Sequence, residues 1–389
     1  MSVWGKLASR YEGKENEKHK LLALDGGGIR GIITLEILAR MEKMLAEATG
    51  GGSDFRLCHF FDYVAGNSTG AVIAAGLALG MTAKELLTFY EEIGPAMFDK
   101  QFILKRWQAM YKSEPLKKEL QKKFGADTTL RPDDLECLLL AVTRNRTTDS
   151  PWPISSNPRA KYNDTSRPDC NLKIPLWQIV RASTAAPLFF PPEVIYWDPN
   201  DDSKAFVFVD GGVTPYNNPS FLLYRMATDP GYRLNWASGE DKLLLISVGT
   251  GAAVSAGEGV EDPDRGLVAN VAGLPGVLMY GAVVDQDTNC RHVGRCVHGA
   301  VLDREISDMI PRDDRGNEIP LSQDLGRRFL YARYNADLSR EGLNAMGLHD
   351  IEPKNVQRLD SIEFIGDLSR IGKKVAEEIK LEHFGDFIS

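Results

Sequence analysis

The sequence has 389 residues, of which 43% are hydrophobic and 26% are charged, a globular composition that excludes a disordered, collagen-like or coiled-coil chain. The net charge of −8 argues against duplex nucleic acid as the main partner, because duplex binding rewards a basic surface. Five scattered cysteines, with Lys and Glu over residues 1–20 where a secretory segment would be apolar, predict a reducing cytoplasm.

The first predicted elements are a strand, a glycine loop and a helix. Residues 1–19 are polar and are expected to be frayed or to lie on the surface. Residues 21–24 read as a short buried strand, which the glycines of residues 25–31 interrupt. From Ile32, apolar residues recur at helical spacing as far as residues 50–52, where three glycines end the predicted helix.

The same order of elements follows further along the chain. Residues 61–65 predict a strand, residues 66–70 a tight turn and residues 71–79 a helix of small side chains. Further β-rich runs occupy residues 138–143, 206–209 and 243–248, and an amphipathic terminal helix is expected from Ser361 to about His383. Strands that alternate with helices predict an α/β fold around a mainly parallel sheet.

Two stretches raise the question of contact with lipid. Residues 266–284 carry no charge over 19 positions, but Asn270, Pro275 and four glycines favour a buried or interfacial helix pair over a membrane span. Residues 98–112 interleave aromatic and apolar side chains with Lys and Arg, which fits an interfacial helix or, slightly better, a helix that faces the core. We therefore predict no transmembrane helix.

Ser68 carries the sharpest chemical signal. It stands in the sequence Gly66-Asn67-Ser68-Thr69-Gly70, between a predicted strand and a predicted helix. The flanking glycines permit a strained turn that lifts the serine hydroxyl to a helix N-terminus, where backbone N–H groups favour developing negative charge. We interpret Ser68 as a nucleophile, and a glycine-rich helix entry selected for packing is the alternative.

The glycine loop has two interpretations. Gly26, Gly28 and Gly31 match the spacing of a dinucleotide-binding fingerprint, but residues 47–54, where an acidic strand end would bind the ribose, are a helix end and a glycine run. The loop amides can instead receive an ester carbonyl oxygen as it becomes an oxyanion, which requires donors and no side chain.

A serine nucleophile needs a base. None of the six histidines stands in a recognisable turn; they are His19, His59, His292, His298, His349 and His383. Asp210 ends a predicted strand before Gly211 and Gly212, which places its carboxylate at the carboxyl edge of the sheet. Asp210 either forms a dyad with Ser68 or is a turn residue, and the residues alone leave both readings open.

Three motifs in order along the chain resemble the patatin-like phospholipase family. They are residues 25–31, residues 66–70 and residues 210–212. The block at residues 181–190 and the sequence Asn217-Asn218-Pro219 also look like that family. The resemblance covers about residues 20–251.

The resemblance implies a three-layer α/β/α sandwich and a lipid acyl hydrolase that cleaves fatty-acyl esters of membrane phospholipids without a cofactor or metal. In it Ser68 is the nucleophile, Asp210 the base in the turn with Gly211 and Gly212, Gly66 and Gly70 form the elbow, and the oxyanion hole comprises Gly26, Gly27, Gly28, Arg30 and Gly31. Arg30 either braces this loop or lies in solvent. An α/β-hydrolase with a later histidine, such as His298 or His349, and a dinucleotide-binding protein are the alternatives.

The length and the tail also resemble bacterial patatin-like effectors of antiphage defence. This implies an enzyme that acts at the inner membrane surface as a peripheral protein, with a cyclic di- or trinucleotide activator that favours an active, homo-oligomeric state. A run at residues 327–334 offers cations and rings for such a ligand (Arg327, Arg328, Tyr331, Arg333 and Tyr334), although an ordinary strand explains it better.

We expect one composite domain. It has a polar segment at residues 1–19, a catalytic core at residues 20–251, and an extension at residues 252–389 that packs on the core with a regulatory or oligomerisation role. Four alternating residues in the extension suggest zinc (Cys290, His292, Cys296 and His298), but their spacing matches no structural-zinc pattern and favours a hairpin.

Overall fold

A computed structural model of the chain describes residues 2–98, 114–187, 190–198, 201–252 and 267–388. Nine strands form one mixed sheet in the order β5-β6-β3-β2-β1-β7-β9-β8, with β4 paired to β3 off this path. The strands are β1 (His19–Leu24), β2 (Tyr63–Asn67), β3 (Leu138–Asn145), β4 (Ser150–Ser155), β5 (Glu193–Tyr196), β6 (Ala205–Asp210), β7 (Leu243–Val248), β8 (Arg295–His298) and β9 (Leu330–Tyr334). Strands β3, β2, β1, β7, β9 and β8 are parallel, whereas β4, β5 and β6 are joined by antiparallel pairs.

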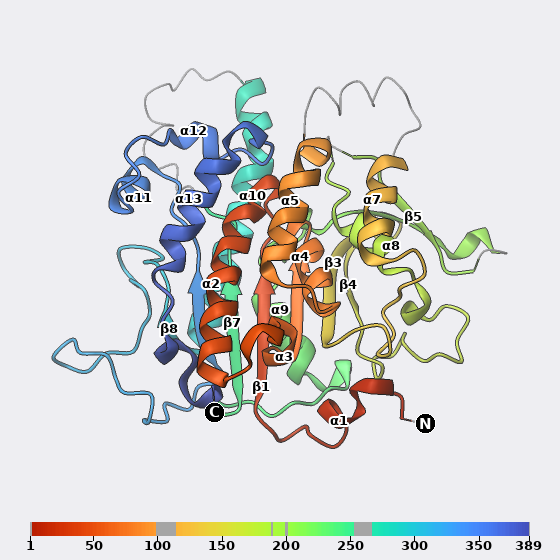
Figure 1. Cartoon of the computed structure of the whole chain (residues 1–389), viewed down its shortest axis with the longest axis horizontal. Helices are drawn as coiled ribbons and strands as arrows, with labels where there is room; N and C mark the ends of the chain where they lie inside the picture. Colours follow the sequence, from red (N-terminus) through yellow and green to blue (C-terminus); the bar gives the residue numbers. More distant parts are fainter. Residues whose placement is uncertain (1, 99–113, 188–189, 199–200, 253–266, 389) are drawn as a thin grey trace.

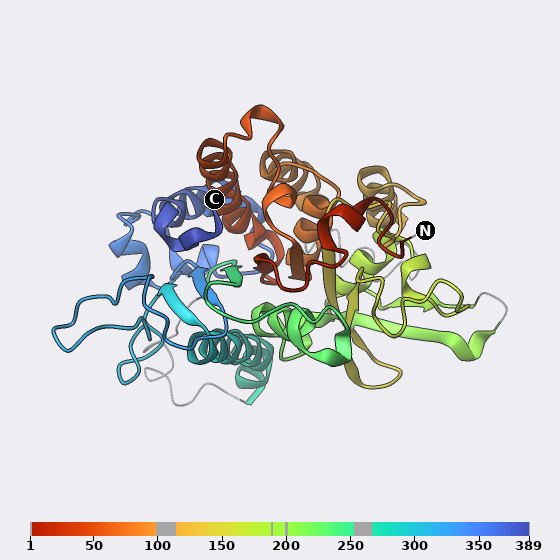
Figure 2. The same cartoon turned by 90° about the horizontal axis from the view of Figure 1, so that it is seen from below.

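Helices cover both faces of this sheet, and Figures 1 and 2 show the three resulting layers. The α-helices are α1 (Ala8–Tyr11), α2 (Gly31–Thr49), α3 (Leu57–Phe60), α4 (Thr69–Ala78), α5 (Ala83–Phe98), α7 (Glu114–Phe124), α8 (Leu176–Ser183), α9 (Ser220–Thr228), α10 (Leu267–Val293), α11 (Arg340–Ala345), α12 (Pro353–Val356) and α13 (Ile365–Ala376). Helices α2, α4, α5 and α13 lie on one face, and α9 and α10 lie on the other. The predicted three-layer α/β/α sandwich is confirmed.

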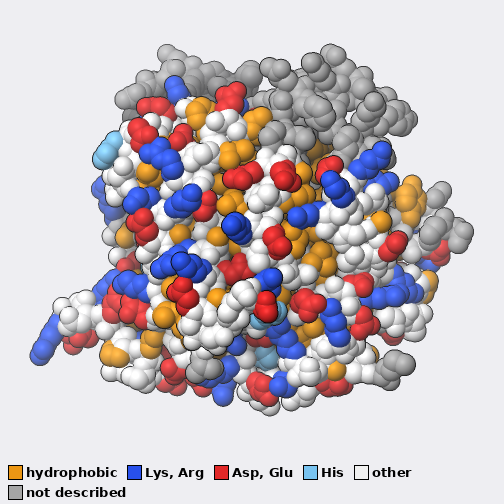
Figure 3. All heavy atoms as spheres, viewed as in Figure 1, with side chains coloured by type: hydrophobic (Ala, Val, Ile, Leu, Met, Phe, Trp, Pro, Cys, Tyr) orange, Lys and Arg blue, Asp and Glu red, His pale blue; other side chains and the backbone are white. Residues whose placement is uncertain are grey.

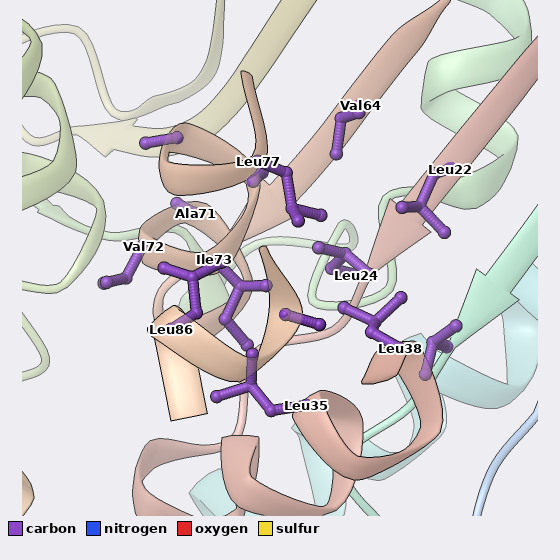
Figure 4. Close-up of a cluster of buried hydrophobic side chains, with 14 of the residues drawn as sticks. Leu22, Leu24, Leu35, Leu38, Val64, Ala71, Val72, Ile73, Leu77 and Leu86 are labelled. Atoms are coloured by element: carbon purple, nitrogen blue, oxygen red, sulfur yellow. The ribbon is translucent and has the colours of Figure 1, made fainter. Parts of the chain in front are cut away.

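The central strands are apolar throughout because both of their faces are covered. Every residue of β2 and of β7 is buried, so the polar alternation of a half-exposed strand is missing from them. On one face, Leu22 and Leu24 of β1 and Val64 of β2 lie in a single cluster with Leu38 of α2 and Leu77 of α4 (Figure 4). On the outside of this helical layer, acidic and basic side chains are intermingled (Figure 3).

The N-terminal segment does not fray, so that alternative is wrong, although much of the segment lies on the surface as the other alternative expected. Trp4 and Tyr11 are each 1% exposed, and their ring centroids lie 5.3 Å apart. The Tyr11 ring also stacks on Trp236 at 6.0 Å. Aromatic side chains bury a large area per residue, so a few of them dock a segment whose average composition is polar.

The C-terminal part differs from the expectation in three elements. From Leu267 onward, the uncharged stretch lies in one continuous helix, α10, and not in a helix pair. Cys290 and His292 lie in α10 while Cys296 and His298 lie in β8, so the predicted hairpin is wrong. The terminal helix is α13 alone, and a 3-10 segment, η9 (Leu381–Phe387), follows it.

Membrane and metal features were sought only among the described residues. None of the helices there combines the length and the apolar character that a membrane crossing requires. No group of three or more His, Cys, Asp and Glu side chains in the described ranges is arranged to hold a metal ion. The five cysteines are free and buried. Most of the predicted interfacial stretch at residues 98–112 lies outside the described residues.

Candidate active site

Ser68 occupies a strained turn between β2 and α4. Its φ of 52° and ψ of −122° are unfavourable for a residue with a side chain, and such strain persists only where the surroundings hold it. Neighbouring backbones come close enough to require glycine on both sides. A Cβ on Gly66 would lie 2.0 Å from the carbonyl oxygen of Gly70, and one on Gly70 would lie 2.2 Å from that of Leu24.

The turn aims the Ser68 hydroxyl at Asp210. Its Oγ donates a hydrogen bond of 2.6 Å to Oδ2 of Asp210, which lies at the end of β6. Strand β6 runs antiparallel to β3, so Asp210 lies on one of the exceptions to the mainly parallel sheet that the sequence predicts. The antiparallel direction returns the end of β6 to Thr143 of β3, beside the carboxyl end of β2.

The Asp210 carboxylate is buried and held by neutral donors. Burial raises the pKa of Asp210 to about 6, against the opposing effect of hydrogen bonds from Ser68, from the Gly212 amide and from Asn67. The Gly212 amide lies 2.7 Å from Oδ1 of Asp210. A Cβ on Gly211 would lie 2.3 Å from the Asn67 side chain, so glycine there permits this close approach.

Ser183 and the Asn67–Asn217 pair support the turn, and sequence reasoning assigned them no role. The Ser68 amide donates to Ser183 Oγ at 2.9 Å, and that hydroxyl donates to the carbonyl of Val142 at 2.7 Å. Asn67 Nδ2 donates to Asn217 Oδ1 at 2.9 Å. Ser183 and Asn217 belong to the two additional blocks that resembled the family. Those blocks were the sequence feature from which a role near the site could have been predicted.

The glycine loop lies beside the same turn. It includes the 3-10 segment η2 (Gly28–Arg30), and Thr69 Oγ1 donates to the carbonyl of Gly28 at 2.6 Å. Three of the five candidate amides are already engaged: Gly26 donates to Asn217 at 3.0 Å, Arg30 to Gly27 at 3.3 Å, and Gly31 to Gly28 and Ile29. Within the described part of the chain, the amides of Gly27 and Gly28 donate to no protein acceptor.

The Arg30 side chain lies between this loop and the C-terminal part of the chain. Its Nη1 donates to the carbonyl of Gln357 at 3.2 Å, and its Nε lies 3.4 Å from that of Gly27. Burial lowers the pKa of Arg30 to about 10, which leaves the guanidinium charged at neutral pH. Arg30 is therefore partly buried and contacts backbone on both sides.

A serine at a strand-to-helix turn beside free loop amides is the arrangement of a hydrolase. The family model of patatin-like phospholipases matches residues 22–223, a range that contains all of these groups. The chain belongs to the patatin-like phospholipase family. This family membership confirms the resemblance on which the sequence interpretation rested.

The chain is similar to two known proteins and to one solved structure. A cGAMP-activated phospholipase of Vibrio cholerae is 31% identical over 235 residues, which are 56% of this chain and 61% of the relative. Patatin group M-1 of Solanum tuberosum is 30% identical over 292 residues, 71% of this chain and 70% of its own. The structure of VipD from Legionella pneumophila aligns with 91% of this chain and 67% of its own at 13% identity and a TM-score of 0.37. This chain therefore spans about three fifths of the length of the Vibrio relative.

The two histidines of the α/β-hydrolase alternative lie away from the patatin-like elbow. His298 belongs to β8, at the opposite end of the strand order from β6, and stacks on His383 at 4.7 Å. His349 is exposed, and its Nδ1 lies 3.1 Å from the side chain of Asn344. Asp210 is therefore the titratable group that contacts Ser68 Oγ.

A buried ion pair ties the glycine loop to β9. Arg333 donates to both carboxylate oxygens of Asp25, at 2.6 and 3.3 Å, and its Nε lies 3.6 Å from Asp287 of α10. Each of the three residues is at most 5% exposed. Burial disfavours the Arg333 charge, but the two carboxylates outweigh burial and raise its pKa. The run at residues 327–334 thus contributes a core strand, in agreement with the strand interpretation.

We predict that Arg333→Met destabilises the protein by about 3–5 kcal/mol, because it leaves the buried Asp25 carboxylate without the cation that binds it, whereas Asp287 keeps its ion pair with Arg291. Urea unfolding followed by circular dichroism measures the loss. Arg312→Met is the matched control, because the Arg312–Asp308 pair is partly exposed and is expected to contribute less than about 1 kcal/mol. Equal and small losses in the two variants would contradict the prediction.

Proposed function

We propose that this protein is a serine acyl hydrolase that cleaves fatty-acyl esters of membrane phospholipids through a Ser68–Asp210 dyad. The observation that carries the proposal is the 2.6 Å hydrogen bond from Ser68 Oγ to a buried carboxylate, next to free loop amides. Family membership supports the reaction class. The dyad is the simplest assignment of roles, because the carboxylate contacts the nucleophile directly.

In the first half-reaction, Asp210 accepts the hydroxyl proton as Ser68 Oγ attacks the ester carbonyl carbon. The carbonyl electron pair moves onto its oxygen, and the amides of Gly27 and Gly28 donate hydrogen bonds to this oxyanion. When the tetrahedral intermediate collapses, the bond to the lysolipid oxygen breaks and that oxygen takes the proton from Asp210.

In the second half-reaction, water replaces the serine. Asp210 accepts a proton from a water molecule, whose oxygen attacks the acyl carbon bound to Ser68. The same loop amides stabilise the second oxyanion, and its collapse releases a fatty acid and returns the proton to Ser68 Oγ. These steps balance with Ser68, Asp210, water and the ester alone.

We predict that Ser68→Ala and Asp210→Asn each lower ester hydrolysis by about a thousandfold or more, because they remove the attacking atom and its base. The measurement is hydrolysis of a short-chain acyl ester by purified variants with unchanged circular dichroism. His298→Ala and His349→Ala are expected to keep most of the activity. Loss of activity in either histidine variant, with structure retained, would favour the α/β-hydrolase alternative.

The raised pKa of Asp210 predicts the pH profile. The base must be ionised to accept a proton, so kcat/KM should be constant well above pH 6 and should fall as Asp210 becomes protonated at lower pH. At one pH unit below the pKa, only about a tenth of the carboxyl groups are ionised, and the rate should decrease accordingly. Circular dichroism across the same range controls for acid unfolding. An acidic limb centred near pH 4 would show that burial does not tune this base.

The finer part of the proposal concerns control. The similarity to a phospholipase whose name records activation by cGAMP supports a cyclic oligonucleotide as the activating ligand here. An effector of antiphage defence that acts on the cytoplasmic face of the inner membrane would need such control, because its substrate is the host's own lipid. Ligand binding would favour an active and oligomeric state.

The test is phospholipid hydrolysis by purified protein with and without a panel of cyclic di- and trinucleotides, with particle size followed by light scattering. We expect activity and size to rise together with one member of the panel and to stay low without ligand. Ser68→Ala controls for contaminating lipase, since it should change size without gaining activity. High activity that no nucleotide alters would reject the regulated effector and leave the acyl hydrolase in place.

A further inference from the structure

A cavity of about 820 Å³ adjoins the turn that carries Asp210. Val209 and Val213, on either side of the Asp210–Gly212 turn, line it. Pro187 also lines it, four residues after the Ser183 that holds the Ser68 amide. The volume lies in the range of small-molecule sites, so part of a lipid can fill it.

The apolar wall of this cavity is held in place by buried contacts. Arg181 donates to the carbonyl of Pro191 at 2.9 Å, and its guanidinium carbon lies 5.4 Å from the centre of the Phe190 ring. Both Phe190 and Pro191 line the cavity. On the other side, the Asp210 amide donates to the carbonyl of Ala185 at 3.0 Å, which joins the segment before Pro187 to the base. The wall is therefore joined to helix α8 through Arg181 and to the Asp210 turn through Ala185.

Two arginines supply the charge of the cavity, and one of them is uncompensated. Arg144 Nη2 donates to Asp149 at 2.5 Å, so its charge is neutralised within the wall. The backbone of Arg146 is fixed, because its amide donates to the carbonyl of Val207 at 2.7 Å. Among the described residues, the Arg146 guanidinium has no hydrogen bond, ion pair or ring contact.

The ladder between β3 and β6 sets the distance of this charge from the dyad. Asp210 pairs with Thr143, and Arg146 lies three residues further along that edge. Three residues of strand correspond to about 10 Å. That separation is too large for contact with the carbonyl under attack, but it suits an anionic group several bonds away from the ester.

We infer that Arg146 is a specificity residue that binds the phosphodiester of the substrate, with the glycerol and adjacent apolar atoms against the proline and Phe190 wall. This inference rests on the proposed acyl hydrolase function. It makes the enzyme selective for phospholipids over neutral acylglycerols, because a guanidinium forms charge-assisted hydrogen bonds with phosphate that a neutral headgroup cannot replace.

The test compares Arg146→Gln, Arg146→Lys and wild type on dihexanoylphosphatidylcholine and dihexanoylglycerol, kept monomeric so that surface adsorption does not contribute. We expect Arg146→Gln to lower kcat/KM for the phospholipid about tenfold or more, with little change for the acylglycerol. Arg146→Lys should restore part of the phospholipid rate. Arg315→Gln, at another exposed arginine, is the matched control and should alter neither substrate.

The inference would be overturned if Arg146→Gln left kcat/KM for the phospholipid unchanged, or if it lowered kcat/KM equally for both substrates. It would also be overturned if the substitution only relieved inhibition by hexanoate, because Arg146 would then bind the carboxylate of the product. A binding measurement tests the inference without turnover. The Kd of Ser68→Ala for dihexanoylphosphatidylcholine should rise when Arg146→Gln is added. If wild type hydrolyses neither ester while this Kd difference holds, the proposed reaction fails and the phosphate site stands.

Discussion

The buried contact between Asp25 and Arg333 joins the two parts of this fold. Asp25 directly precedes the glycine loop, and Arg333 belongs to β9, more than 300 residues later in the chain. The Ile29 amide also donates to the carbonyl of Leu359 at 3.0 Å, so the C-terminal part contacts the loop at a second point. The loop that bears the free amides is therefore tied at Asp25 and at Ile29 to residues outside the range that the family model matches.

The site combines backbone strain with burial. Strain orients the Ser68 hydroxyl, and burial raises the pKa of the Asp210 carboxyl group. The strained turn at Ser68 is held by the Ser183 hydroxyl and by glycines that admit neighbouring backbone, so the Ser68 hydroxyl is held in one orientation. Burial then raises the pKa of Asp210 to about 6, which makes a carboxylate a better proton acceptor while keeping it ionised at neutral pH. Neutral donors around the carboxylate limit this rise, so no cation is needed beside it.

Local patterns were sufficient to predict the elements near Ser68. The apolar run of β1, the glycine loop and the periodic helix α2 were all predicted, and Gly50 ends α2 in the left-handed conformation with a φ of 69°. The Ser68 elbow was recognisable because flanking glycines and a strand-to-helix change occur within a few residues. In the C-terminal part, similar reasoning was wrong for Cys290 and His292, because an alternating pattern over so few residues does not distinguish a strand pair from a helix end.

The sequence by itself determined the fold class, the family and the residue types available at each turn, since these depend on composition and on order along the chain. Only the tertiary structure decided which of these groups meet. The return of β6 antiparallel to β3 brings Asp210 to Ser68, the pairing of β9 with β7 brings Arg333 to Asp25, and the same return places Arg146 beside an apolar cavity. The Ser68–Asp210 and Asp25–Arg333 contacts join residues 142 and 308 positions apart, so they depend on strand order and direction, which no local pattern encodes.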